Sequence, residues 1–178
     1  MKRRDFFRVA ALSGAAIAVP GIDVLATGRN DGHNDKPVIG FKFRPDGKFK
    51  IVQFTDTHYI AGDPRSERAL ANVREILDKE KPDLVIHTGD IIFGNPAAQS
   101  AIEILQPMAE RGIPFVVALG NHDSDFELSR TEIFDVIRGI KGNVNTPIRQ
   151  ALYGCSNDVI ALSSSKGVER VSYILDSG

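Results

Sequence analysis

The sequence predicts an α/β fold in which short parallel strands alternate with helices. Three apolar runs, at residues 50–55, 83–88 and 114–119, have the length of buried strands, and each ends in glycine or polar residues. The stretches between them carry apolar residues at helical spacing. Strands and helices that alternate at this spacing give parallel strands joined by crossover helices.

The strand that begins this pattern is preceded by a short alternating stretch. Residues 41–44 alternate apolar and basic side chains, Pro45-Asp46-Gly47 has the composition of a turn, and a second strand is expected over residues 48–54. This arrangement predicts a β-hairpin. A second, antiparallel pair is predicted near the end of the chain, with strands at residues 159–162 and 170–175 around a serine-rich turn.

Helical spacing predicts three helices. They cover residues 63–79, 98–111 and 129–137. In the second, Ile102, Leu105 and Met108 are expected on the buried face. In the third, Ser129 is followed three residues later by Glu132, which is the spacing of a capping box at a helix N-terminus.

Length and composition indicate an ordinary globular protein. The chain has 178 residues, of which 42% are hydrophobic and 25% charged, enough for one domain with a substantial core. The formal net charge of -1 gives no electrostatic reason to expect nucleic acid or an anionic membrane as a partner. We therefore expect no nucleic-acid partner. The polar residues described below make a small molecule the expected partner, and the sequence does not indicate an oligomeric state.

The N-terminus has the pattern of an export signal. A twin arginine, Arg3-Arg4, lies in a basic segment, and the uncharged residues 9–19 are too few to span a bilayer, which takes roughly 20. We predict a signal peptide over residues 1–26, a polar linker over 27–38 and a domain over 39–178. The protein is then periplasmic or secreted, without stable membrane insertion. The alternative is an amphipathic N-terminal helix.

Polar side chains follow three of the predicted strands. Asp56 and His58 follow the first, Asp90 the second and Asn121 the third. Because the carboxyl ends of parallel strands meet at one edge of a sheet, these groups are expected to converge. Asp56 and His58 can bind one ion, Asp90 can bridge two, and Asn121 offers an amide oxygen to the second. Mixed oxygen and nitrogen ligands suit Fe, Mn or Zn.

His122 directly follows a predicted ligand and is the candidate catalytic residue. Its imidazole titrates near neutral pH, so it can bind a substrate oxygen or protonate a leaving group. Two cations about 3.5–4 Å apart can activate a bridging hydroxide for in-line attack on phosphorus. The sequence thus predicts phosphoester hydrolysis without a covalent enzyme intermediate.

Other polar residues have plainer explanations. On a purely structural reading, the carboxylates and amide at the strand ends are only caps. His87 lies inside a strand and is interpreted as a buried histidine of the core. Asp123 can orient its neighbour or cap the next turn, and both remain open. Arg65, Arg68 and Arg130 could hold a phosphate but are interpreted as solvated arginines on helix surfaces.

These motifs resemble those of a known family. Asp56-Thr57-His58, Gly89-Asp90 and Gly120-Asn121-His122-Asp123 are similar to the first three motifs of the calcineurin-like metallophosphoesterases. The closing Leu175-Asp176-Ser177-Gly178 is similar to the subgroup related to purple acid phosphatases. The resemblance implies a two-layered β sandwich flanked by helices, a dinuclear metal centre, and hydrolysis of phosphomonoesters or phosphodiesters. The resemblance also implies that Asp56, His58, Asp90 and Asn121 are the metal ligands. It implies that His122 is the catalytic histidine.

The chain also departs from the family pattern. The family completes its metal centre with a later histidine and a Gly-His-x-His motif, whereas no histidine follows His122. In some relatives an acid three residues after the bridging aspartate orients the catalytic histidine, and here that position is Phe93. We therefore expect an N-terminal portion of a longer enzyme with little activity. The alternative is a non-catalytic remnant that binds metal weakly or acts through protein interaction.

Overall fold

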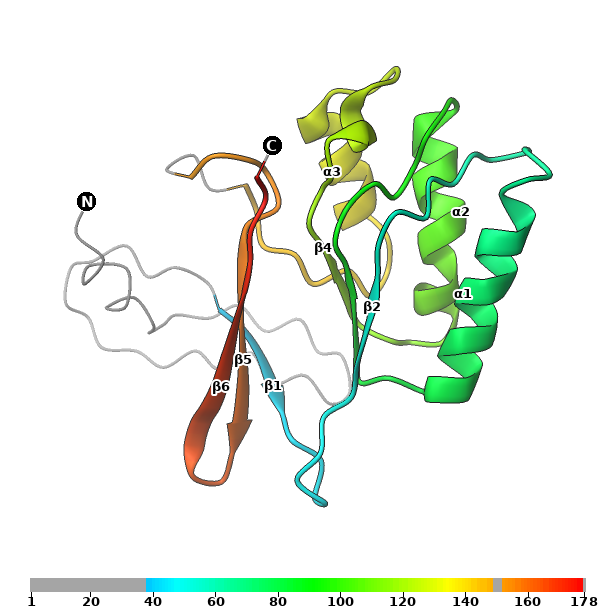
Figure 1. The fold of residues 1–178 in the computed structure, drawn as a ribbon. Helices are drawn as coiled ribbons and strands as arrows, with labels where there is room; N and C mark the ends of the chain where they lie inside the picture. The colour runs from blue at the N-terminus through cyan, green and yellow to red at the C-terminus, as the bar shows by residue number, and fades with distance from the viewer. Residues whose placement is uncertain (1–37, 149–151, 178) are drawn as a thin grey trace. The chain divides into compact units, whose positions relative to one another are not determined.

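The computed structural model describes residues 38–148 and 152–177, which form two compact units (Figure 1). Of the described residues, 38–48 and 158–173 form one unit, and 49–148, 152–157 and 174–177 form the other. The predicted signal peptide, 1–26, and all but the last residue of the predicted linker, 27–38, lie outside the described residues. The single domain predicted over 39–178 stays a prediction.

The larger unit is built on a parallel sheet. Its strands are β2 (Ile51–Phe54), β3 (Leu84–His87) and β4 (Phe115–Val117), with β3 in the centre. Both pairs are parallel, with Val52 opposite Val85 and Val85 opposite Phe115. The α/β prediction is confirmed. Within the run 83–88 the sequence predicts a strand at residues 84–87, which are the bounds of β3, whereas β4 ends two residues earlier than the predicted run 114–119.

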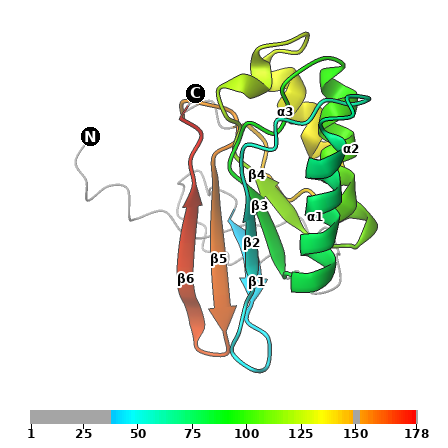
Figure 2. The same cartoon turned by 45° about the vertical axis from the view of Figure 1, so that its right-hand side comes forward.

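Three helices accompany this sheet. They are α1 (Glu67–Glu80), α2 (Ala97–Glu110) and α3 (Arg130–Arg138). In Figure 2, α1 and α2 lie against one face of the sheet, and α3 contacts α2. Their apolar faces and the sheet form one core that includes Leu77, Leu105 and Phe134, each almost fully buried. Apolar burial of this kind is the main stabilising contribution to the unit.

Two helix predictions need correction. The first helix begins at Glu67, because residues 63–66 form a turn closed by the Ser66 N–H donating to the Asp63 carbonyl at 2.9 Å. In α2, Ile102 is exposed, and Ile104 is buried in its place beside Leu105. The capping box of α3 is confirmed: Ser129 accepts from the Glu132 N–H, and the Glu132 side chain accepts from the Ser129 N–H.

The smaller unit is a second three-stranded sheet. Its strands are β1 (Ile39–Lys42), β5 (Asp158–Ser164) and β6 (Gly167–Ile174), in the order β1-β5-β6. The arrows of β5 and β6 run in opposite directions in Figure 2, as predicted for this pair. The predicted hairpin of β1 with the next strand is wrong. The turn at Pro45-Asp46-Gly47 forms, but β1 pairs in parallel with β5, with Ile39 opposite Ile160.

No helix among the described residues is long and apolar enough to cross a membrane.

Candidate metal centre

The three predicted motif loops leave the same edge of the parallel sheet, and the loops after β2 and β3 stay paired beyond it. The Asp56 N–H donates to the Gly89 carbonyl at 3.0 Å, and the His58 N–H donates to the Asp90 carbonyl at 3.0 Å. The pairing ends at a parallel bridge between Tyr59 and Ile92. The loops after β2 and β3 are therefore fixed to each other by backbone hydrogen bonds before any ligand binds.

Three of the predicted ligand residues have left-handed backbones. The φ angles of Asp56, His58 and Asp90 are 52°, 44° and 51°. For residues with a Cβ, this conformation costs on the order of 1–3 kcal/mol each, and such residues concentrate at functional sites. The surrounding hydrogen bonds hold these residues in strained positions at the sheet edge.

Side chains from all three loops meet in one cluster. Ligand atoms of His58, Asp90 and His122 lie within 4.8 Å of one another. Within the cluster, His58 Nε2 lies 3.5 Å from Asp90 Oδ2. Two imidazoles and a carboxylate form a donor set that suits Zn, Mn or Fe. The residues present therefore fit a transition-metal ion, and the predicted convergence of the loops is confirmed for these three side chains.

Asp90 connects the second loop to the third. Its Oδ2 faces His58, and its Oδ1 accepts the backbone N–H of His122 at 3.0 Å. Gly120 is required for this arrangement, because a Cβ there would collide with the Asp90 carboxylate. Gly89 is equally constrained, since its φ is 105° and a Cβ would lie 2.6 Å from the Gly120 Cα.

Asp56 and Asn121 lie in the same loops, and Asp56 is not part of the cluster of three side chains. Asp56 is exposed, and its Oδ2 accepts a hydrogen bond from the Thr55 hydroxyl at 2.5 Å. Asn121 is exposed and directly precedes the 3₁₀ turn η2 (His122–Ser124). Their assignment as metal ligands stays a prediction.

The His122 ring is held by an acidic neighbour that the sequence analysis did not single out. Its Nδ1 lies 2.6 Å from Asp125 Oδ2. The hydrogen bond to Asp125 raises the pKa of His122 above its usual value, and the charges of Asp90, Asp125 and Asp123 act in the same direction. The sequence offered one indication of this contact: Asp125 follows His122 by three residues, a spacing that brings side chains together in a tight turn.

Asp123 has a different role from the two considered in the sequence analysis. Its side chain is buried, and Oδ1 accepts the N–H groups of Ile91 at 2.7 Å and Ile92 at 3.1 Å. Its Oδ2 accepts the Gly120 N–H at 2.8 Å. Burial raises the pKa of Asp123, although these backbone donors favour the charged form. One carboxylate thus ties the loop after β4 to the loop after β3.

Phe93 forms an apolar wall beside the cluster. Its ring centroid lies 5.1 Å from that of His58 and 5.0 Å from that of His122, and a second phenylalanine, Phe126, lies 5.8 Å away. Although phenylalanine is normally buried, 45% of Phe93 is exposed. An exposed aromatic ring therefore borders the candidate metal site.

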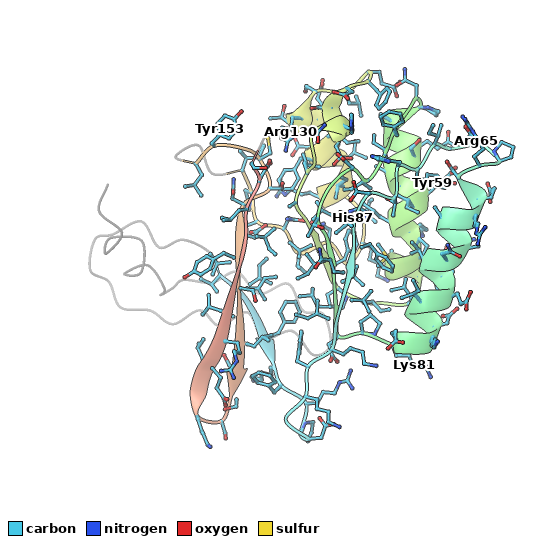
Figure 3. The ribbon with its side chains drawn as sticks, in the orientation of Figure 1. Tyr59, Arg65, Lys81, His87, Arg130 and Tyr153 are labelled. Atoms are coloured by element: carbon cyan, nitrogen blue, oxygen red, sulfur yellow. The ribbon has the colours of Figure 1, made fainter. Side chains whose placement is uncertain are left out.

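The predictions for the arginines need one correction. Arg65 is solvated as expected and pairs with Asp63 of its own turn, at the outer edge of the unit (Figure 3). Arg130, in contrast, is mostly buried and donates to the carbonyls of Gly120 at 2.7 Å and Leu119 at 2.9 Å. It was expected on a solvated surface because helix periodicity does not reveal partners that come from other segments.

The partner of Arg130 is a buried carboxylate near the end of the chain. Asp176, whose side chain is fully buried, forms an ion pair with Arg130. Its Oδ2 also accepts the N–H groups of Cys155 at 2.8 Å and Ser156 at 3.1 Å and the Ser156 hydroxyl at 3.0 Å. This network supports the backbone immediately before Asn121.

His87 is a core histidine, as predicted. Only 2% of it is exposed, its Nε2 lies 3.0 Å from the Thr57 hydroxyl, and Figure 3 shows it on the central strand. Burial lowers the pKa of His87 to about 4, against the opposing effect of the charges of Asp56 and Asp90. At neutral pH this ring is uncharged.

The comparison with protein families identifies the domain. The calcineurin-like phosphoesterase model matches residues 49–173, which is most of the chain. This chain belongs to the calcineurin-like phosphoesterase family. The parallel sheet with flanking helices and the metal-ligand cluster at its edge agree with that assignment.

Curated relatives match the chain over about half of its length. It is 37% identical over 117 residues to "Probable inactive purple acid phosphatase 28" of Arabidopsis thaliana, covering 54% of this chain and 29% of the relative. It is 35% identical over 108 residues to "Phosphatase DCR2" of Saccharomyces cerevisiae, covering 51% and 19%. It is 30% identical over 122 residues to "Probable inactive purple acid phosphatase 14" of Arabidopsis thaliana, covering 58% and 30%. The aligned part is thus less than a third of each of these relatives.

Proposed function

We propose that this chain is part of a metal-dependent phosphoesterase that hydrolyses small phosphomonoesters or phosphodiesters. The observation that supports it best is the cluster of His58, Asp90 and His122 within 4.8 Å, in a domain of the calcineurin-like phosphoesterase family. The three side chains come from three separate loops, so their convergence depends on the whole sheet.

In the proposed site, Asp56 and His58 would hold a first metal ion, Asn121 would hold a second, and Asp90 would be a ligand of both. The ions are Fe, Mn or Zn; when bound, they supply charge stabilisation at the phosphoryl oxygens and an activated water. Asp90 keeps its place because its other oxygen binds the His122 N–H. His122 donates a proton to the leaving-group oxygen.

The first experiment measures hydrolysis by purified protein that is stripped of metal and reloaded with Mn²⁺ or Zn²⁺. The substrates are 4-nitrophenyl phosphate, bis(4-nitrophenyl) phosphate and phenyl phosphate. We expect slow, metal-dependent turnover, and we expect His122→Ala to reduce the rate on phenyl phosphate by roughly 10²–10⁴-fold, the usual contribution of a general acid. His33→Ala, in the predicted linker, is the matched control. A His122→Ala variant as active as the parent would rule out the role given to His122.

A second candidate function is a non-catalytic protein that binds metal weakly or acts through protein interaction. The names of two relatives, which describe them as probable inactive purple acid phosphatases, favour it. Isothermal titration with Mn²⁺ separates the candidates: metal binding without turnover of any of the three substrates supports the non-catalytic protein.

We also propose export of the protein through the twin-arginine route, to the periplasm or beyond. This rests on the sequence pattern around Arg3-Arg4 and the apolar residues 9–19. The route carries folded proteins, which would allow metal loading before translocation. Fractionation of cells that express the Arg3→Lys/Arg4→Lys variant tests it: we expect retention inside the cell, and unchanged export would contradict the proposal.

A further inference from the structure

The hydrogen bond between His122 and Asp125 is built by a tight backbone turn. The two residues begin and follow η2, and the Asp125 N–H donates to the His122 carbonyl at 3.1 Å. A 3₁₀ turn has three residues per turn, so side chains three apart lie above one another. The 2.6 Å distance between His122 Nδ1 and Asp125 Oδ2 is thus a product of local geometry.

The turn itself is anchored to the rest of the site. Asp123, inside η2, accepts one backbone N–H from Ile91 in the loop after β3 and one from Gly120 in its own loop, through its two oxygens. The His122 N–H donates to Asp90 Oδ1 at 3.0 Å. The backbone of His122 and Asp125 is therefore fixed relative to the candidate ligand Asp90.

Aromatic neighbours restrict the ring as well. The Phe93 ring meets the His122 ring at an interplanar angle of 88°, and the His58 ring meets it at 74°. With the ring bordered on these sides and its Nδ1 held by a carboxylate, Nε2 is the nitrogen left for a substrate or ion. An ionised carboxylate can only accept a hydrogen bond, so the Nδ1 of a neutral His122 must carry the proton.

We propose that Asp125 is a positioning residue for His122: it accepts the Nδ1 proton, selects the ring tautomer and leaves Nε2 to the site shared with His58 and Asp90. The consequence for reaction chemistry rests on the proposed function, because it matters only if His122 donates a proton from Nε2. The tautomer itself does not depend on activity. The second nitrogen of a working histidine is commonly fixed in this way.

The decisive experiment is nuclear magnetic resonance of metal-free protein labelled with ¹⁵N-histidine, at an alkaline pH where the ring is neutral. Long-range ¹H–¹⁵N correlations report which ring nitrogen carries the proton, and His122→Ala assigns the signals. We expect the Nδ1–H form for His122 in the parent and the Nε2–H form in Asp125→Ala. Asp135→Ala, which removes an exposed carboxylate outside the cluster, is the matched control and should leave the parent pattern.

Two results would overturn the proposal. One is a parent protein in which His122 carries its proton on Nε2, which can be seen without any variant. The other is an Asp125→Ala protein, shown to be folded by its amide spectrum, in which the tautomer does not change. Neither result requires turnover, so failure of the positioning role is distinguished from failure of the proposed function.

The loaded protein supplies a second measurement that a merely structural role would not reproduce. If Asp125 acts through the proton on His122, Asp125→Ala should slow phenyl phosphate, whose leaving group needs a proton, by at least about 10-fold more than 4-nitrophenyl phosphate, whose leaving group does not. In the His122→Ala background the same substitution should have no further effect. Equal slowing of both substrates would count against positioning through His122.

Discussion

His87 is an uncharged histidine that is buried in the central strand, and this makes the stability of the protein depend on pH. Its pKa is about 4 in the folded state, because of burial, against a usual value of 6.5. Between pH 6.5 and pH 4, His87 is therefore protonated in the unfolded chain but largely neutral in the folded chain. This contribution to stability is complete above pH 6.5 and is lost as the pH falls toward 4.

We predict that the parent loses about 2 kcal/mol of unfolding free energy through His87 between pH 7 and pH 5. In His87→Leu, which lacks the titrating group, the loss of unfolding free energy between pH 7 and pH 5 should be smaller than in the parent by this amount. Urea denaturation at the two pH values measures both differences. Equal losses in parent and variant would contradict the assignment of the lowered pKa to His87.

Phe93 lies beside the His122 ring but cannot form a hydrogen bond with it. It occupies the position three residues after Asp90 and lies against His122 without a polar atom to offer. Asp125, which follows His122 by three residues in the chain, makes the hydrogen bond to the same ring. The histidine is thus supported by an acid of its own turn.

At the scale of single elements, α3 begins with a complete capping box. The Ser129 side chain accepts from the Glu132 N–H, and the Glu132 carboxylate accepts from the Ser129 N–H at 2.9 Å. Hydrogen bonds from Ser129 lower the pKa of Glu132. The cap fixes the start of the helix, and the next residue, Arg130, is the one that reaches the Gly120 carbonyl.

We predict that Ser129→Ala lowers the unfolding free energy by about 1 kcal/mol, the usual cost of removing an N-cap oxygen. Ser129→Asp, which keeps an acceptor at this position, should retain most of the stability. Chemical denaturation gives both values. A loss of the same size in both variants would show that the serine acts by something other than capping.

The ion pair of Arg130 and Asp176 connects α3 with the segment after β6. Because Asp176 is fully buried, removal of its partner leaves an uncompensated charge inside the unit. We predict that Arg130→Leu costs about 3–5 kcal/mol of unfolding free energy. Arg65→Leu, at a solvated arginine paired within its own turn, should cost far less, because an exposed ion pair contributes little to stability.

A double-mutant cycle distinguishes the ion pair from general loss of packing. The double variant Arg130→Leu/Asp176→Asn should lose less stability than the sum of the losses in the two single variants. Each single variant leaves one charge unpaired, whereas the double variant removes both charges. Additive losses would argue against direct coupling between the two side chains.

For the whole molecule, metal binding should stabilise the fold. Ions held by the proposed ligands Asp56, His58, Asp90 and Asn121 would bind the folded state and link loops from three strands. At a free concentration of about 100 times the dissociation constant, Mn²⁺ should add about 2.7 kcal/mol to the unfolding free energy. Thermal unfolding with Mn²⁺ and with a chelator measures the shift.

The control for this prediction is a pair of aspartate variants. Asp90→Asn should abolish the metal-dependent shift, whereas Asp135→Asn, at an exposed side chain outside the cluster, should retain it. A shift that survives Asp90→Asn would place the stabilising ion elsewhere.

Local sequence patterns predicted the parts of the fold that depend on neighbouring residues. The bounds of β3, the cap of α3 and the buried His87 follow from short apolar runs and fixed spacings. The pairing of β1 was wrong because its partner β5 lies more than a hundred residues away in sequence. A turn that closes correctly does not decide which strand will pair.

The sequence by itself determined that three strand ends deliver His58, Asp90 and His122 to one edge, because parallel topology permits no other arrangement of those ends. Only the tertiary structure decided what holds the edge together. Asp123 binds two loops through backbone N–H groups, and Arg130 turns inward to a carboxylate contributed by a distant segment. The physical reason is that periodicity reports which face of an element is buried. Hydrogen bonds and ion pairs depend on which segments meet.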